Sequence, residues 1–279
     1  MNYLDFLAKT PNLSWSGVLS LFFLVLMRII PIVSIAPFLG SKITPIPAKM
    51  GLALFLGLIF FPIVVPTAAY STGFTVAFLG YSIKEIFIGF ILGFFSSIPF
   101  YMVQTSGILI DYLRGASMMQ SQDPSMQNQA SPIGILYNYI LIVMFFQING
   151  PFLFFDAIMQ SYQIIPPDSF FNPLFFHNEF PFWKTAIDLA NKVVTIGIQL
   201  AAPALVAILM AEMFLGIANR LAPQVQIAFL GMSIKSLLGL ALLWAAWFFL
   251  LKQFSYQLSS WLDVINTLVR NLTIIAPAK

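Results

Sequence analysis

The sequence has 279 residues, of which 59% are hydrophobic and only 8% are charged. Soluble domains carry about 25% charged residues, so this composition excludes an ordinary soluble domain and predicts an integral membrane protein. The 13 basic and 10 acidic residues form no cluster that would bind nucleic acid, and the absence of cysteine excludes disulfides and thiolate metal sites.

The first two apolar segments contain prolines inside runs that otherwise predict spanning helices. Residues 16–38 contain Arg28 and two prolines, without the small-residue cleavage pattern of a signal peptide, so we expect this segment to be retained. The second segment begins at Met50 and contains two further prolines. A proline removes one backbone hydrogen bond, so both helices are expected to be kinked or broken. Residues 40–49 between them predict a short loop outside the hydrocarbon.

The third apolar segment is too long for one simple span. Residues 74–113 would make a helix of about 60 Å, twice the ~30 Å hydrocarbon core of a bilayer. Lys84 and Glu85 interrupt the segment near one end and Pro99 near its middle, which favours two helices or a hairpin. Neighbouring side chains on a helix point about 100° apart, so Lys84 and Glu85 are not expected to pair.

A polar stretch, "RGASMMQSQDPSMQNQASP", occupies residues 114–132. Arg114 and Asp123 are its only charges, and Asp123–Pro124 predicts a turn. The simplest interpretation is a solvated loop. Its methionines and glutamines, however, supply deformable and uncharged contacts that such a loop does not need.

The remaining chain predicts three more apolar segments. The fourth covers residues 133–161, the fifth 184–219, and the sixth 225–251 with an amphipathic continuation to residue 270. A proline-rich stretch before the fifth segment predicts an extramembrane loop. We therefore expect an all-α membrane protein with about six hydrophobic helical segments in a single domain, residues 1–279.

Reactive groups are too sparse to predict an enzyme. The sequence has no zinc-protease, nucleophile-elbow, dinucleotide or P-loop motif. His177 is the single histidine and cannot complete a metal site alone. Asp111 and Asp123 could act as paired carboxylates, but nothing near them resembles a nucleophile or base system. No catalytic activity, cofactor or metal is expected.

Charged residues within the apolar segments are more informative, because each costs a few kcal/mol to insert into a membrane. These residues are Arg28, Lys84, Glu85, Glu212 and Lys235. Arg28 and Glu212 are expected to be buried in an assembly, whereas Lys84 and Lys235 also fit snorkelling at helix ends. Glu212, Gly216 and Arg220 recur every four residues and form one stripe.

Small residues at helical spacing indicate where helices could approach closely. Gly89 and Gly93 lie four apart, a spacing that permits helix contact but is also common in apolar sequence. Intramembrane charges also occur in proton relays, so a small-solute transporter or channel is the alternative function. Transporters usually show interrupted helices at matching positions of two halves, and the prolines here show no such symmetry.

Several motifs resemble one family, the T subunit of the type III secretion export gate, which includes the flagellar protein FliR. The main motif is "LGIANRLAPQVQIAFLGMSIK", residues 215–235, preceded by an apolar helix with Pro203 and Glu212. The blocks "RIIPIVSIAPFLG" with "PAKMGLAL", "KEIFIGFILGF", and "SPIGILYN" followed by "SYQIIP" occur in the family's order. "PFLG" and "SPIGILYN" resemble the injectisome type more than the flagellar type.

The resemblance implies a non-enzymatic, multi-pass subunit of a helical export gate in the bacterial inner membrane. Its implied partners are the R and S subunits, the U and V subunits, transiting unfolded substrate proteins and membrane lipid. A flagellar export-gate subunit is the alternative within the family.

Two sets of site residues accompany this resemblance. The expected pore plug comprises Gly115, Met118, Met119, Gln120, Gln122, Asp123 and Pro124. The expected helix or inter-subunit contacts comprise Arg28, Glu85, Gly89, Gly93, Glu212, Gly216, Arg220, Pro223, Gln224 and Lys235.

Overall fold

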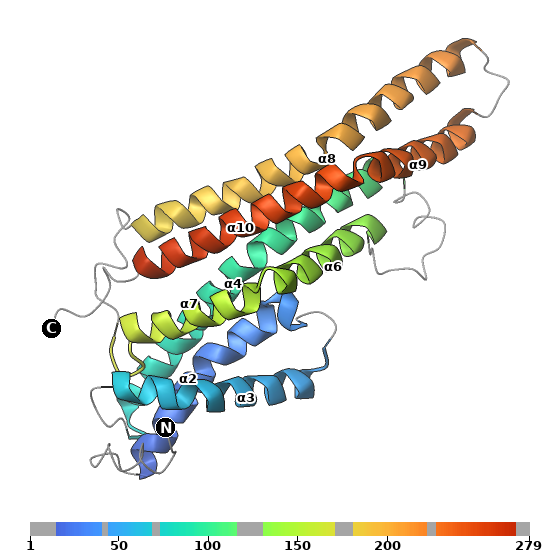
Figure 1. Ribbon diagram of the computed structural model, residues 1–279. Coiled ribbons are helices and arrows are strands. Elements are labelled where there is room, and N and C mark those ends of the chain that lie inside the picture. The colour runs from blue at the N-terminus through green and yellow to red at the C-terminus, as the bar shows by residue number, and fades with distance from the viewer. Residues whose placement is uncertain are drawn as a thin grey trace. The chain divides into compact units, whose positions relative to one another are not determined.

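A computed structural model describes residues 15–40, 44–68, 73–115, 131–170, 181–221 and 227–271 (Figure 1). Within these ranges the regular structure is entirely helical, which confirms the all-α prediction. The elements are α2 (Trp15–Ile35), η1 (Pro37–Leu39), α3 (Ile46–Val64), η2 (Val65–Thr67), α4 (Val76–Leu113), α6 (Pro132–Gln147), α7 (Gly150–Ile164), α8 (Pro181–Leu221), α9 (Ile227–Ala245) and α10 (Trp247–Asn271).

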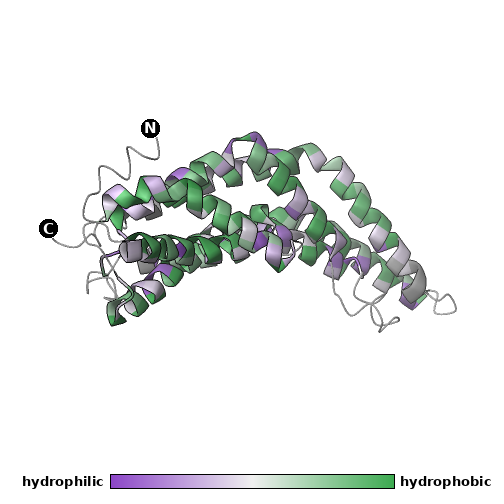
Figure 2. Cartoon of the chain, turned by 90° about the horizontal axis from the view of Figure 1, so that it is seen from below, coloured by the Kyte–Doolittle hydropathy of each residue, from purple (hydrophilic) through white to green (hydrophobic). Residues whose placement is uncertain are grey.

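Hydrophobic residues make up most of the helices, and polar residues occupy scattered positions along them (Figure 2). In the part of the chain that the structure describes, four helical segments are long and apolar enough to cross a membrane, namely α2, Ile46–Thr67, α4 and Lys184–Leu221. The pairs α6–α7 and α9–α10 bring the number to as many as six if each pair is one span. The expectation of about six segments is therefore confirmed.

The chain forms two compact units. Unit 1 consists of Met1–Ser97, Asn149–Ile187 and Leu262–Lys279, and unit 2 consists of Ile98–Ile148 and Asp188–Trp261. The single-domain organisation expected from the sequence stays a prediction.

Aromatic side chains pack edge to face inside each unit. In unit 1, Phe38 meets Phe154 with ring centroids 5.2 Å apart. In unit 2, Tyr137 meets Phe254 at 5.1 Å. Aromatic pairs prefer such edge-to-face geometry, which fixes the register of the packed helices.

The prediction that residues 74–113 form two helices or a hairpin is wrong. They form one helix, α4, of 38 residues, and Pro99 lies inside it. A proline removes only one hydrogen bond of the helix ladder. Helix packing compensates for that loss, because 67% of the most apolar stretch of α4 is buried.

Two of the predicted apolar segments, the fourth and the sixth, are each divided into two helices. The fourth segment divides at Ile148–Asn149, where Asn149 adopts a left-handed conformation with φ of 58°. The sixth segment bends by 65° between α9 and α10. The predicted loop 40–49 is also too long, because Pro47 in the first turn starts α3 at Ile46.

Candidate functional site

Two glycines bring α2 and α4 of unit 1 into backbone contact. A Cβ atom on Gly89 would lie 2.1 Å from the carbonyl oxygen of Arg28, and one on Gly93 would lie 3.2 Å from the Cα of Ile32. Only glycine permits the first of these approaches. The contacts follow the same order along both helices, so α2 and α4 run parallel here.

This close approach places Arg28 against Glu85 in a buried, two-pronged ion pair. Arg28 Nε donates to Glu85 Oε2 at 2.6 Å, and Nη2 donates to Oε1 at 2.9 Å. Both side chains have an exposed fraction of 0%. Paired guanidinium–carboxylate hydrogen bonds are strong and directional, so they fix the rotation of the two helices relative to each other.

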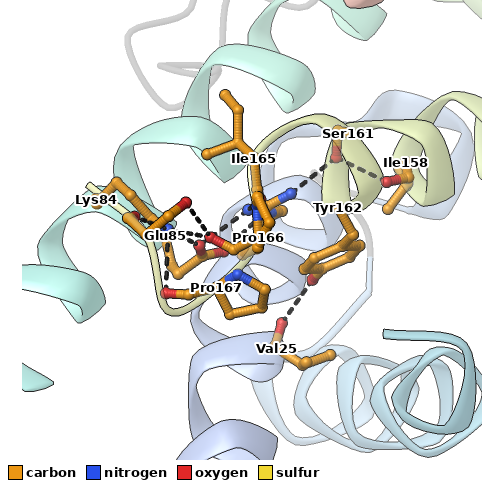
Figure 3. A network of polar contacts seen from close by, with 11 residues as sticks. Val25, Lys84, Glu85, Ile158, Ser161, Tyr162, Ile165, Pro166 and Pro167 are labelled. Carbon is orange, nitrogen blue, oxygen red and sulfur yellow. Dashed lines mark hydrogen bonds and ion pairs between the residues drawn. The ribbon is translucent and has the colours of Figure 1, made fainter. Parts of the chain in front are cut away.

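The remaining donors of Arg28 hold the C-terminal end of α7 (Figure 3). Arg28 Nη1 donates to Ser161 Oγ at 3.0 Å, and Nη2 donates to the carbonyl of Ile165 at 2.9 Å. The guanidinium carbon lies 3.9 Å from the ring centroid of Tyr162. The Tyr162 hydroxyl donates to the carbonyl of Val25 at 3.0 Å, which is a second link to α2.

Lys84 completes the cluster, and its predicted separation from Glu85 is wrong. Lys84 Nζ lies 2.7 Å from Glu85 Oε1 although the two residues are adjacent. Its flexible four-carbon stem lets the ammonium reach round to the carboxylate, so the direction of the Cβ atoms does not decide the contact. Snorkelling is also excluded, because the Lys84 side chain is only 3% exposed.

The same ammonium binds the backbone that follows α7. Lys84 Nζ donates to the carbonyls of Pro166 at 2.8 Å, Pro167 at 3.1 Å and Ser169 at 2.8 Å. Asp168 is buried in this turn and interacts electrostatically with Lys84. Two cations and two carboxylates therefore balance one another inside unit 1.

A third buried carboxylate, Asp111 in unit 2, joins the end of α4 to the start of α6. Asp111 Oδ1 accepts a hydrogen bond from Arg114 Nη2 at 2.6 Å, and Oδ2 accepts from Ser131 Oγ at 2.5 Å and Ile133 N at 2.9 Å. This clasp holds the residues that flank positions 116–130. The sequence alone indicates no such structural role for Asp111, only a possible pairing with Asp123 in catalysis.

Most of the expected plug lies outside the described residues. Gly115 is described and adopts a φ of 86°, a left-handed conformation that favours glycine. The other six residues of that set, and His177, fall in ranges that the structure leaves undescribed. Among the residues it describes, no three histidine, aspartate or glutamate side chains gather as a metal site would require.

The expected stripe on α8 is exposed within this chain. Glu212 Oε1 lies 2.6 Å from Lys235 Nζ of α9, with side chains 54% and 19% exposed. A Cβ atom on Gly216 would meet nothing within 4 Å, and Arg220 is exposed. Burial of Glu212 in an assembly stays a prediction. Pro223 and Gln224 lie outside the described residues.

Comparison with known proteins adds a match along most of the chain. The model of the bacterial export proteins, family 1, matches residues 19–261. The Yop proteins translocation protein T of Yersinia pestis is 35% identical over 57% of this chain and 60% of its own length. The secretion system apparatus protein SsaT of Salmonella typhimurium is 32% identical over 59% of this chain and 61% of its own length.

A flagellar relative aligns over a longer range at lower identity. The flagellar biosynthetic protein FliR of Escherichia coli is 26% identical over 82% of this chain and 85% of its own length. The match to the two secretion proteins spans less than two thirds of their length. The higher identity to them agrees with the injectisome-like motifs, and the family match over residues 19–261 shows that this chain belongs to the bacterial export proteins, family 1.

Proposed function

We propose that this chain is a structural and gating subunit of a type III secretion export gate, part of the channel through which secreted proteins cross the bacterial inner membrane. The family match along residues 19–261 is the observation that carries this proposal. The higher identity to relatives named for Yop translocation and for a secretion system apparatus favours an injectisome over a flagellum. In this role the chain has no catalytic activity, and small-solute transport is not favoured.

We propose that R and S subunits cover the exposed face of α8, with the U and V subunits nearby. The last three turns of α8 combine large apolar side chains with charges: Met213, Phe214 and Leu221 are 69%, 72% and 81% exposed, and Glu212 and Arg220 are exposed as well. Lipid would accept the apolar residues but not the charges. A neighbouring protein with polar groups satisfies both.

Co-purification tests this assembly. The chain is expected to co-purify with R and S subunits and to transport no solute when purified alone. Glu212→Ala and Arg220→Ala should each lower the recovered R and S subunits about tenfold or more, because Glu212→Ala leaves Lys235 unpaired in the interface and Arg220→Ala leaves a partner's polar group unpaired there. Lys192→Ala, which removes an exposed charge nearer the start of α8, is the control. Unchanged assembly and secretion in both variants would contradict the proposed contacts.

We further propose that the segment beginning at Gly115 occludes the channel between export events. Its composition supports this role, since uncharged and deformable side chains can seal against ions and still yield to unlike polypeptides. The Asp111 clasp supports it as well, because it fixes the two flanking helix ends at one place.

Deletion of residues 115–122 is expected to raise ion conductance through the assembled gate while R and S subunits still co-purify. The deletion spares the Asp111 clasp and its partners. Replacement of the same eight residues by a glycine–serine linker of equal length is the control for chain length, and it should leak as well because it lacks bulky side chains. An unchanged conductance in the deletion variant would refute the plug.

A further inference from the structure

Helix α7 ends beside the middle of α2. Its first turns lie near the C-terminal end of α2, where Phe154 meets Phe38 of η1. Its last turn lies beside Val25, which receives the hydrogen bond from Tyr162. Helix α2 has 21 residues and a length of about 30 Å, equal to the hydrocarbon core of a bilayer. Helix α7 therefore runs antiparallel to α2 and accompanies it for only part of that length.

The chain continues in the same direction after α7 ends. Phe170 packs against Tyr81 with ring centroids 4.4 Å apart, and a Cβ atom on Gly80 would lie 3.0 Å from the Phe170 ring. Gly80 precedes Gly89 by nine residues, or about 13 Å along α4. Because α2 and α4 run parallel, residue 170 lies about that far beyond the level of Arg28, toward the N-terminal ends of both helices.

The stretch between these points is non-helical, and two of its residues have no backbone hydrogen-bond donor. Pro166 and Pro167 have no backbone N–H and end the helix. The carbonyls of Ile165, Pro166, Pro167 and Ser169 accept no hydrogen bond within a helix. Irregular backbone at membrane depth is tolerated only where its polar groups are satisfied by protein or water.

Ser169 donates its backbone N–H and its hydroxyl to the carbonyl of Pro166, and two side chains of unit 1 supply the other donors. Arg28 donates to the carbonyl of Ile165, and Lys84 donates to those of Pro166, Pro167 and Ser169. We infer that residues 150–170 make one broken crossing of unit 1, a helix followed by a non-helical stretch with one turn, in which the Lys84 ammonium fills a carbonyl-lined cation site at the break. The crossing belongs to the chain itself and is independent of the export role.

The first experiment tests the role of Lys84. The native chain has no cysteine, so Gly80→Cys with Phe170→Cys provides one reactive pair for a short thiol cross-linker in membranes. Adding Lys84→Met, which keeps the apolar stem and removes all donors, should lower the cross-link yield about tenfold or more. Lys84→Gln, which keeps two N–H donors, should give an intermediate yield. Lys192→Met, at an exposed lysine, should change nothing.

A Lys84→Met chain that cross-links as well as the native chain would overturn the cation site. The intermediate yield of Lys84→Gln separates hydrogen bonding from simple packing, because the glutamine and methionine side chains have similar size. Equal losses in the two variants would show that donors do not matter and would also overturn it.

The second experiment leaves the ion cluster intact and tests the crossing. Phe152 at the start of α7 is 73% exposed, and Phe170 is 53% exposed. Single Phe152→Cys and Phe170→Cys chains are expected to react with a membrane-impermeant maleimide from opposite faces of the membrane. Labelling of both positions from one face, or of neither position, would overturn the crossing.

Discussion

Replacing Glu85 by glutamine is expected to lower the free energy of unfolding of the solubilised chain by about 3–5 kcal/mol. The substitution keeps the shape of the side chain and removes its charge. Arg28 and Lys84 would then remain as two buried cations without the carboxylate that both contact. The amide nitrogen of glutamine would also face hydrogen-bond donors of Arg28 or Lys84, whichever way the amide turns. Thermal or denaturant unfolding in detergent, followed by circular dichroism, measures the effect.

Glu212→Gln provides the matched control, because Glu212 also pairs with a lysine at 2.6 Å but is 54% exposed. Exposed ion pairs contribute less than about 1 kcal/mol, so this variant should unfold almost as the native chain does. If Glu85→Gln lowered the free energy of unfolding as little as Glu212→Gln does, the buried cluster would not stabilise unit 1. A double variant, Arg28→Met with Glu85→Gln, should lose less than the sum of the single losses, because neighbouring residues of one network are not additive.

The sequence predicted the helices well because long apolar runs of helical length have few other structures in a membrane protein. It also marked Arg28 and Glu85, since a charge in such a run needs a protein partner. The sequence does not predict that Arg28 and Glu85 pair with each other, because they are 57 residues apart and meet only when α2 and α4 pack together. The spacing of Gly89 and Gly93 does not decide whether another helix contacts them, and the structure shows that both contact α2.

The wrong predictions share one physical cause: they follow from local geometry, whereas tertiary contacts decide the structure at these positions. The directions of the two Cβ atoms predict that Lys84 and Glu85 lie apart. The long lysine side chain nevertheless lets its ammonium group contact both the Glu85 carboxylate and the carbonyl of Pro166. Pro99 predicts a break within residues 74–113, although packing holds α4 together as one helix. The sequence presents Asp111 only as a possible catalytic residue. In the structure its hydrogen-bond donors other than Arg114 are Ser131 and Ile133, at the start of the next helix.

Gly89→Ala is expected to destabilise the chain by about 3 kcal/mol, at the upper end of the usual cost of an overfilled core. The added methyl group would stand 2.1 Å from a backbone oxygen of Arg28, which no side-chain rotation can relieve. Helices α2 and α4 must then separate, and the Arg28–Glu85 pair would lose its geometry. Gly216→Ala is the opposite case, because its Cβ atom meets nothing within 4 Å. Alanine favours a helix by about 1 kcal/mol over glycine, so this variant should be slightly more stable.

The two glycine variants also separate contacts within the chain from contacts with partners. Gly89→Ala should lower the melting temperature of the purified chain and, through that loss, the amount of gate assembled. Gly216→Ala should raise the melting temperature of the purified chain yet reduce the recovery of R and S subunits, if a neighbouring helix approaches this position as proposed. Gly51→Ala, at a glycine of α3 that is equally open, should change neither assembly nor secretion. Full assembly with Gly216→Ala would remove Gly216 from the proposed interface, whereas a native melting temperature with Gly89→Ala would contradict the backbone contact between α2 and α4.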